Sequence, residues 1–363
     1  MIMKKSFLVI AAMATLVACN NEEVMDVAPK TSIAFGDAFV ENSTRAIDGT
    51  LNTNNLTSFN VYGSVTGDGN TVNIFSGVEV KKTTDSQPST GDVTSTDGNW
   101  WYAGDNTQYW IVGNAYSFAA VVNGDVTEFT QDARGENNMP TKISYDATDQ
   151  KDLLYATASV TSAATSQSDV KFTFDHLLAK AQFTFTNTMT SNTASILYQY
   201  RVTDVKITNA YMLGVCNVEN YGGNGVVWTA SATDAKPRTV VSFGNIDNAT
   251  ATNINPNSAL VGAVATKASA TSHYQKLLIP NTYEDLIITC KIETLLNGVV
   301  IDTKLEHTIN PALITLEAGK AYNFIISKGN PGEPIKFALE KVNNWDPETG
   351  GTDTSVVTPT PSN

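Results

Sequence analysis

Apolar and polar residues alternate along most of the chain, in short runs rich in Thr, Val, Ile, Phe and Tyr that end at Gly, Asn or Asp. A period of two is typical of β-strands, and no stretch keeps an apolar helical stripe for the length that a stable helix needs. The sequence therefore predicts an all-β protein. The clearest runs are SFNVYGSV (58–65), AYSFAAVV (115–122), VKFTFD (170–175), KAQFTFTN (180–187), DVKITNAYM (204–212), LIITCKIETL (286–295) and YNFIIS (322–327).

Short strands at regular spacing favour β-sandwiches, and 363 residues are enough for two of them. The stretch TNTMTSNTAS (186–195) is weakly patterned, which places the predicted boundary near residue 188. We expect one sandwich over 46–188, a second over 189–345 and a flexible tail over 346–363.

Two further amphipathic strands lie outside the bulk of the predicted sandwiches, one near each end of the chain. TSIAFGDAFV (31–40) and PIKFALEKV (334–342) both alternate large apolar residues with small or polar ones. Their predicted apolar faces comprise Ile33, Phe35 and Phe39 in the first strand, and Ile335, Phe337 and Leu339 in the second.

The chain opens with a positively charged and then apolar leader that ends in LVAC at Cys19. The apolar run is too short to cross a bilayer stably, so residues 1–18 are expected to be a secretory signal. LVAC resembles a bacterial lipoprotein box, in which the cysteine becomes the lipidated first residue. The following NNEE resembles the acidic segment of surface lipoproteins in Bacteroidetes. An outer-membrane lipid anchor at Cys19 is expected, and an ordinary signal peptide is the alternative.

The composition limits the classes of molecule that the chain is expected to bind. The chain has 36 acidic and 23 basic residues, a net charge of −13, and no basic cluster, which argues against nucleic acid and anionic membranes. Proteins or glycans are the expected partners. Only Cys216 and Cys290 follow Cys19, each among apolar residues, so both a disulfide and two buried thiols are open.

No catalytic or cofactor motif is present in the sequence: GxSxG, HExxH, CxxC and a phosphate-binding loop are all missing. His176, His273 and His307 are far apart and lack neighbouring ligands, so they are interpreted as packed or solvent-facing. The acidic stretch 146–152 lacks the spacing of a calcium loop. We expect no enzyme, no metal and no cofactor. A sugar platform is the minority interpretation, and core packing the preferred one, for the aromatic set Trp100, Trp101, Tyr102, Tyr109 and Trp110.

The turn-prone stretch ENSTRAID (41–48) contains Arg45, the only basic residue between Lys30 and Lys81. A protease that cuts after basic residues would therefore find one site in this part of the chain. Taken alone, Arg45 is better interpreted as a surface arginine in a linker.

Several phrases in their order and spacing resemble the fimbrillin family of Bacteroidetes pilus proteins. The resemblance spans the whole chain and includes the lipoprotein box, the early I-x-F strand followed by TRA, and a terminal Trp345. The other matching phrases are YWIVGNAYSFAAVV (109–122), DLLYATASV (152–160), FTFDHLLAKAQFTF (172–185), LLIPNTY (277–283) and LEAGKAYNFII (316–326).

This resemblance implies two transthyretin-like β-sandwich domains in tandem and a cell-surface pilus subunit that supports adhesion. It implies processing between Arg45 and Ala46 by an Arg-specific protease, which removes the propeptide 19–45 with its strand. The opened groove would then accept the C-terminal strand of another pilin subunit, in a homopolymer or heteropolymer located in the fimbrium at the cell outer membrane.

Two alternatives stay open at this point. The chain could be a monomeric surface lipoprotein that binds a glycan or host protein through its aromatic patch. Within the pilin interpretation, 335–341 could belong permanently to its own sandwich, with 355–358 as the donor or with no donor at all.

Overall fold

The computed structural model describes residues 31–40, 51–342 and 352–353, except positions 133, 136, 165–166, 191–192, 194, 223–224, 234–236, 246–252, 255–258, 262–274 and 310–312. Regular structure in this part consists of strands and two short 3-10 turns, η1 (Gly104–Asn106) and η2 (Ala147–Asp149), without an α-helix. The predicted all-β class is confirmed. Among the described residues, no helix has the length and apolarity to cross a membrane.

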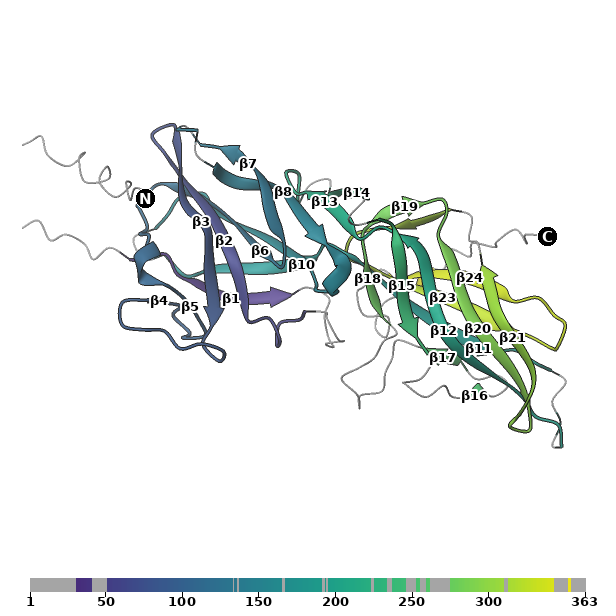
Figure 1. Ribbon diagram of the computed structural model, residues 1–363. Helices are drawn as coiled ribbons and strands as arrows, with labels where there is room; N and C mark the ends of the chain where they lie inside the picture. The colour runs from purple at the N-terminus through teal and green to yellow at the C-terminus, as the bar shows by residue number, and fades with distance from the viewer. Residues whose placement is uncertain are drawn as a thin grey trace, which may run out of the picture.

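The largest sheet has eight strands and contains the N-terminal strand at one edge (Figure 1). β1 pairs with its neighbour β10 in parallel, whereas the other pairs of this sheet are antiparallel. In spatial order the strands are β1 (Phe35–Val40), β10 (Val170–His176), β9 (Leu154–Val160), β6 (Ala115–Val122), β2 (Ser58–Gly67), β3 (Asn70–Lys82), β5 (Trp100–Tyr102) and β4 (Val93–Thr94).

Four smaller sheets complete the fold. One contains β14 (Val227–Ser231), β13 (Leu213–Asn217), β8 (Asn137–Asp146) and β7 (Asp125–Gln131). The next contains β17 (Ala259–Val261), β11 (Ala179–Asn187), β23 (Lys320–Lys328), β24 (Lys336–Val342) and β25 (Thr352–Asp353), with β18 (Lys276–Leu278) also on β11. The third contains β15 (Thr239–Gly244), β12 (Tyr198–Ala210), β20 (Ile287–Leu296) and β21 (Val299–Ile309), with β16 (Asn253–Ile254) on β12. The last pairs β19 (Asn281–Tyr283) with β22 (Ile314–Leu316).

The large sheet separates two hydrophobic cores, because its central strands are buried on both faces. In β6, Phe118 and Ala120 face a first core that also contains the apolar residues of β1 and β10, whereas Ala119 and Val121 face a second core. Alternate residues of a strand point to opposite faces, so one run of apolar residues can line both cores. This explains why AYSFAAVV is almost continuously apolar while VKFTFD alternates.

The second core continues from the large sheet into the C-terminal half of the chain, where it includes Phe183, Ile288 and Phe324. Strand pairing crosses the predicted boundary near residue 188 in both directions. β11, which precedes it, pairs with β23, and β13, which follows it, pairs with β8. The division into two sandwiches stays a prediction. A cut at residue 188 would break two sheets, so any such division must assign β11 to the later part and β13 to the earlier part.

Candidate functional site

β1 and the residues just before it lie in a groove that bonds their backbone on two sides. On one side β1 pairs with β10, from Phe35 opposite Val170 to Val40 opposite Phe174. On the other side, the Ile33 N–H donates to the Gln108 carbonyl at 2.8 Å, and the Trp110 N–H donates to the Thr31 carbonyl at 3.0 Å. We call this position, between β10 and residues 108–110, the β1 groove. A strand here satisfies backbone groups on both flanks, so its departure leaves two rows of them without partners.

Phe35 fills an aromatic pocket in the floor of the β1 groove. The side chain is 1% exposed. Its ring centroid lies 5.2 Å from Phe75, 5.6 Å from Tyr102, 5.9 Å from Phe118 and 6.0 Å from Phe172. Aromatic pairs at such separations add to the free energy of burial. The pocket therefore holds β1 through contacts of one buried ring with four other aromatic rings.

Tyr102 links this pocket to the backbone just before β1. Its hydroxyl donates a hydrogen bond of 2.6 Å to the Ile33 carbonyl. Burial raises the pKa of Tyr102, so the phenol stays protonated and keeps its proton for that bond. Ile33 itself is fully buried, as predicted from the alternation of the strand.

Phe39 does not share the buried face, so that prediction is wrong. The register with β10 shifts between Gly36 and Ala38, and Asp37 between them has a φ of +40°. This bulge inserts one residue and reverses the alternation after it. Ala38 and Val40 consequently point into the first core, whereas Phe39 is 50% exposed.

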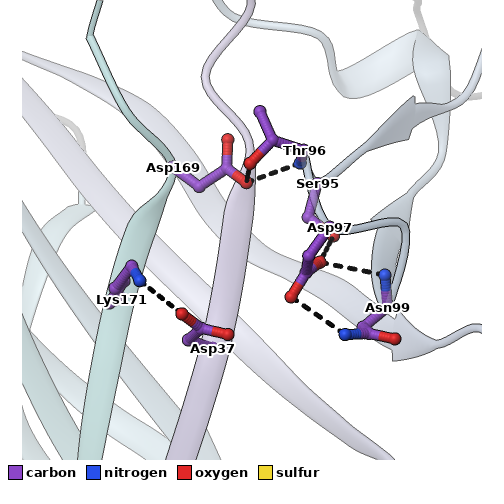
Figure 2. A network of polar contacts seen from close by, with 7 residues as sticks. All are labelled: Asp37, Ser95, Thr96, Asp97, Asn99, Asp169 and Lys171. Atoms are coloured by element: carbon purple, nitrogen blue, oxygen red, sulfur yellow. Dashed lines mark hydrogen bonds and ion pairs between the residues drawn. The ribbon is translucent and has the colours of Figure 1, made fainter.

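A polar rim lies along the outward side of the β1 groove (Figure 2). Asp37 of β1 forms an ion pair with Lys171 of β10, and this contact raises the pKa of Lys171. Asp169 lies one residue before β10. Its carboxylate accepts hydrogen bonds from the Thr96 N–H at 2.6 Å and from the Thr96 Oγ1 hydroxyl at 2.8 Å. Figure 2 shows the Asp169 side chain extending in front of the β1 ribbon towards the loop that carries Thr96.

Asp97 adds a second carboxylate to this loop. Burial raises its pKa, but hydrogen bonds from Ser95 and Asn99 outweigh that effect and bring the pKa below its ordinary value. The distances are 2.6 Å to Ser95 Oγ and 3.0 Å to the Asn99 N–H. Asp97 is therefore ionised at neutral pH, close to the end of the rim that Asp169 forms.

Cys19, Arg45 and Ala46 lie outside the described residues. The residues on either side of 41–50 are held by hydrogen bonds. The Val40 N–H donates to Thr53 Oγ1 at 3.0 Å, and the Leu51 N–H donates to Asp152 Oδ2 at 2.9 Å. Residues 41–50 are the only covalent connection between β1 and the rest of the fold on its C-terminal side.

Asp152 belongs to a buried pair that sequence reasoning did not find. Its Oδ2 lies 2.8 Å from Nδ1 of His176, and the two side chains are 0% and 2% exposed. His176 ends β10, so the pair ties the strand beside β1 to Leu51. A single spacing in the sequence does not reveal such a pair, because its members meet only when β9 and β10 are side by side.

The C-terminal strand is seated in its own sheet. β24 pairs with β23 from Lys336 to Val342, and β25 pairs with its other edge. Phe337 and Leu339 are 5% and 7% exposed within the second core, and Ile335 is partly buried against it. The three residues thus share one apolar face, as predicted. This face packs within the chain's own sheet, as in the alternative in which 335–341 belongs to its own sandwich.

The aromatic set and the cysteines are placed as follows. Trp100, Tyr102 and Trp110 are buried in the first core, which leaves only Trp101 and Tyr109 of the set accessible for a sugar platform.

Cys216 and Cys290 are free and buried, and burial raises the pKa of each thiol to about 12. Among the described residues, no group of three acidic, His or Cys side chains is arranged to hold a metal ion.

The chain is similar to solved structures that are described as fimbrial or putative cell adhesion proteins. One from Bacteroides vulgatus has a TM-score of 0.53 and 16% identity, covering 87% of this chain and 99% of that one. A fimbrial assembly protein from Parabacteroides distasonis has a TM-score of 0.39 and 11% identity, and the match covers 90% of this chain and 100% of that one. At 16% identity the first likeness shows the all-β fold alone.

The sequence itself defines the family. A family model described as fimbrillin-like matches residues 44–345, and the chain belongs to that family. The resemblance found in the sequence phrases is thereby confirmed. Among curated proteins, none matches the sequence.

Proposed function

We propose that the chain is a structural subunit of a surface pilus, exported as a lipoprotein, processed after Arg45 and polymerised by strand exchange to support adhesion. Its partners would be an Arg-specific protease, other copies or other pilins, and the outer membrane through a lipid at Cys19. Host proteins or glycans would be the receptors of the finished fibre. Membership of the fimbrillin-like family supports the pilus role.

The position of β1 is the observation that carries the strand-exchange proposal. β1 is an edge strand, yet it contributes Phe35 to the first core, and Ile33 just before it is also in that core and bonds the opposite flank. A cut within 41–50 turns it from a tethered strand into a separate peptide, which loses the high local concentration that holds it in place. The vacated β1 groove would present unpaired backbone and an aromatic pocket, which is the surface that an added strand recognises.

The strand 335–342 is the proposed donor. IKFALEKV repeats the spacing of isoleucine and phenylalanine that β1 has in IAFGDAFV. To reach another copy it must leave β23, where Phe337 packs 6.1 Å from Phe324. Polar substitutions of Phe337 would therefore disturb folding as well as donation. The rival donor 355–358 lies outside the described residues.

The lipid anchor has a direct test. We expect a clickable fatty acid to label the protein in cells, because LVAC matches the substrate of lipoprotein maturation, and we expect Cys19→Ala to lose the label. Gel fluorescence after click coupling measures it. Equal labelling of both proteins would mean that Cys19 is not the anchor.

Replacing Arg45 with alanine should abolish polymerisation. Treatment of the purified full chain with an Arg-specific protease should remove the propeptide and give ladders and fibres, whereas Arg45→Ala should stay monomeric. The other three arginines are ion-paired in the fold, at 3.1 Å to Asp132, 2.8 Å to Glu293 and 2.6 Å to Asp285, so they should be cut far more slowly. Gel electrophoresis, N-terminal sequencing and electron microscopy provide the readout.

Two outcomes would contradict the proposal. Fibres formed by uncut Arg45→Ala would exclude processing as the trigger. A wild-type chain that is cleaved at Arg45 and remains monomeric at high concentration, under conditions where β1 has left, would exclude polymerisation through the vacated groove.

A further inference from the structure

Most of the exposed apolar side chains in the described part of the chain gather in two places. Twelve large apolar side chains are exposed there, and eight of them, three and five, belong to two short surfaces. The first, which we call the turn surface, consists of Tyr109, Ile111 and Val112. The second, which we call the tip surface, consists of Ile196, Leu197, Val299, Val300 and Ile301. Single exposed apolar residues are normal on a protein, whereas contiguous patches mark interaction sites.

The turn surface is held in a fixed shape beside the β1 groove. The Asn114 N–H donates to the Ile111 carbonyl at 3.2 Å, and Gly113 between them has a φ of +86°, as a type II turn requires. Ile111 and Val112 are 49% and 61% exposed on this turn. The turn follows directly on residues 108–110, which bond the backbone just before β1. One flank of the groove therefore leads straight into an apolar surface.

The tip surface is held together by Asn297, which forms the turn between β20 and β21 with Gly298. The two residues have φ values of +49° and +84°, as in a type I′ hairpin turn. The Asn297 N–H donates to the Leu197 carbonyl at 2.8 Å, and Asn297 Oδ1 accepts from the Leu197 N–H at 2.8 Å. These bonds hold Ile196 and Leu197 against the hairpin. Figure 1 shows this hairpin at the end of the molecule away from β4 and β5.

The turn that precedes β24 lies at the same end as the tip surface. Tyr200 follows Leu197 by three residues, and its hydroxyl donates a hydrogen bond to the Gly329 carbonyl, in the turn between β23 and β24. The Asn187 Nδ2, at the end of β11, donates to the Tyr198 carbonyl at 3.2 Å. The start of the proposed donor strand 335–342 is thus connected to the tip surface through bonded neighbours.

Neither surface contains a charged residue. The sequence has none from Asn106 to Gly124, from Ala181 to Tyr200, or from Thr294 to Ile301. The chain has a net charge of −13, so copies of it repel one another at long range. A contact between the two surfaces would bury apolar area without taking a charged group out of water. These surfaces are therefore suited to a contact with a second copy of this acidic chain.

We propose that the tip surface of one copy packs on the turn surface of the next copy in the fibre. The inference rests on the proposed function, but it concerns a contact outside the groove. A strand that enters parallel to β1 has its amino end beside residues 108–110. The residues that precede Ile335 in the donor copy then pass the turn surface of the acceptor copy. Gly329 and its partner Tyr200 bring the tip surface with them.

This contact would fix the angle between successive copies. A strand in a groove is a single connection, about which two copies can rotate, whereas a second contact beside it stops that rotation. The strand already holds the two copies together, so the second contact forms at a high effective concentration and needs little affinity of its own. The free copies would accordingly stay monomeric until a strand is exchanged.

Serine substitutions in the full chain cut after Arg45 test the contact. The pair Ile111→Ser with Val112→Ser removes apolar area from the turn surface without adding charge, and the pair Val299→Ser with Ile301→Ser does so at the tip surface. Each pair should raise the protein concentration needed for fibre growth about tenfold, the effect of losing burial of two partly covered apolar side chains. Light scattering measures growth against concentration.

Val227→Ser with Val240→Ser is the matched control. These valines are 64% and 49% exposed, but they lie in β14 and β15 and belong to neither surface. The control should need the same concentration as wild type. Thermal unfolding of each uncleaved variant confirms that it is folded, which is expected because all six side chains are exposed.

Labelling of an introduced thiol shows whether the turn surface is covered in the fibre. In a Cys19→Ala background, Val112→Cys should react with a maleimide dye before assembly and become protected in fibres. Val227→Cys should react equally in both states. Cys216 and Cys290 contribute little background, because both are buried and their pKa is raised. Equal labelling of Val112→Cys before and after assembly would leave the turn surface open for a host protein, and would overturn the inference.

The outcomes separate this inference from the proposed function. Wild-type fibres together with serine pairs that grow at the wild-type concentration overturn the contact alone. Failure of cleaved wild-type chains to assemble overturns the proposed function, and this inference with it.

Discussion

Replacing Phe35 with alanine lowers the free energy of unfolding of the uncleaved chain by about 3–5 kcal/mol, the cost of deleting a buried aromatic ring. The effect is large because the ring is 1% exposed and contacts four other aromatic side chains, one each in β3, β5, β6 and β10. The remaining structure cannot collapse into the space without moving the large sheet. Urea denaturation followed by circular dichroism measures the change.

Phe39→Ala is the matched control. It removes the same side chain from the same strand, but Phe39 is 50% exposed beyond the bulge. We expect a change within about 0.5 kcal/mol, as for other surface substitutions. Equal losses for the two variants would show that the register of β1 beyond Gly36 differs from the one described.

The second large effect is expected at Asp152. Asp152→Ala removes the partner of His176 and the acceptor of the Leu51 N–H in one step. Removing the acceptor from a buried polar pair costs about 1–3 kcal/mol, because the groups that it contacted have already been taken out of water. Chemical denaturation of the uncleaved chain measures it, and earlier proteolysis near Leu51 should accompany it.

Asp149→Ala serves as its control, since Asp149 lies three residues earlier, is exposed and ends η2. Its expected change is within about 0.5 kcal/mol. If Asp152→Ala were as stable as Asp149→Ala, the pair would not anchor the chain after residue 50, and Leu51 would need another explanation for its position.

The strands were predictable because alternation reports burial on one face. β6 and β10 begin and end within one residue of the runs AYSFAAVV and VKFTFD. Phe39 was missed because strict alternation assumes an unbroken pleat. The Gly36–Asp37 dipeptide carried a signal for the bulge, since glycine and aspartate are the residues that tolerate unusual backbone angles.

Long-range features were not predictable by the same reasoning. The pair of Asp152 and His176 forms only when two strands meet in space. The parallel pairing of β1 with β10 joins segments that are more than a hundred residues apart in the sequence. The weakly patterned stretch after residue 186 indicated a break in strand structure. It could not indicate that β11 had already joined the later sheet, because pairing partners leave no trace in local composition.

The parallel direction of β1 has a consequence for symmetry. A strand that takes its place in the same direction enters with its amino end beside residues 108–110 and its carboxyl end beside Phe174. The giving surface and the receiving surface of a copy are then different, so the contact is heterologous and no two-fold axis relates the two copies. Unless the rotation from one copy to the next closes a ring, such a contact builds an open filament. A filament assembled in this way would be polar: one terminus would offer an empty groove and the other an unused strand, so its two ends would grow and be capped by different partners.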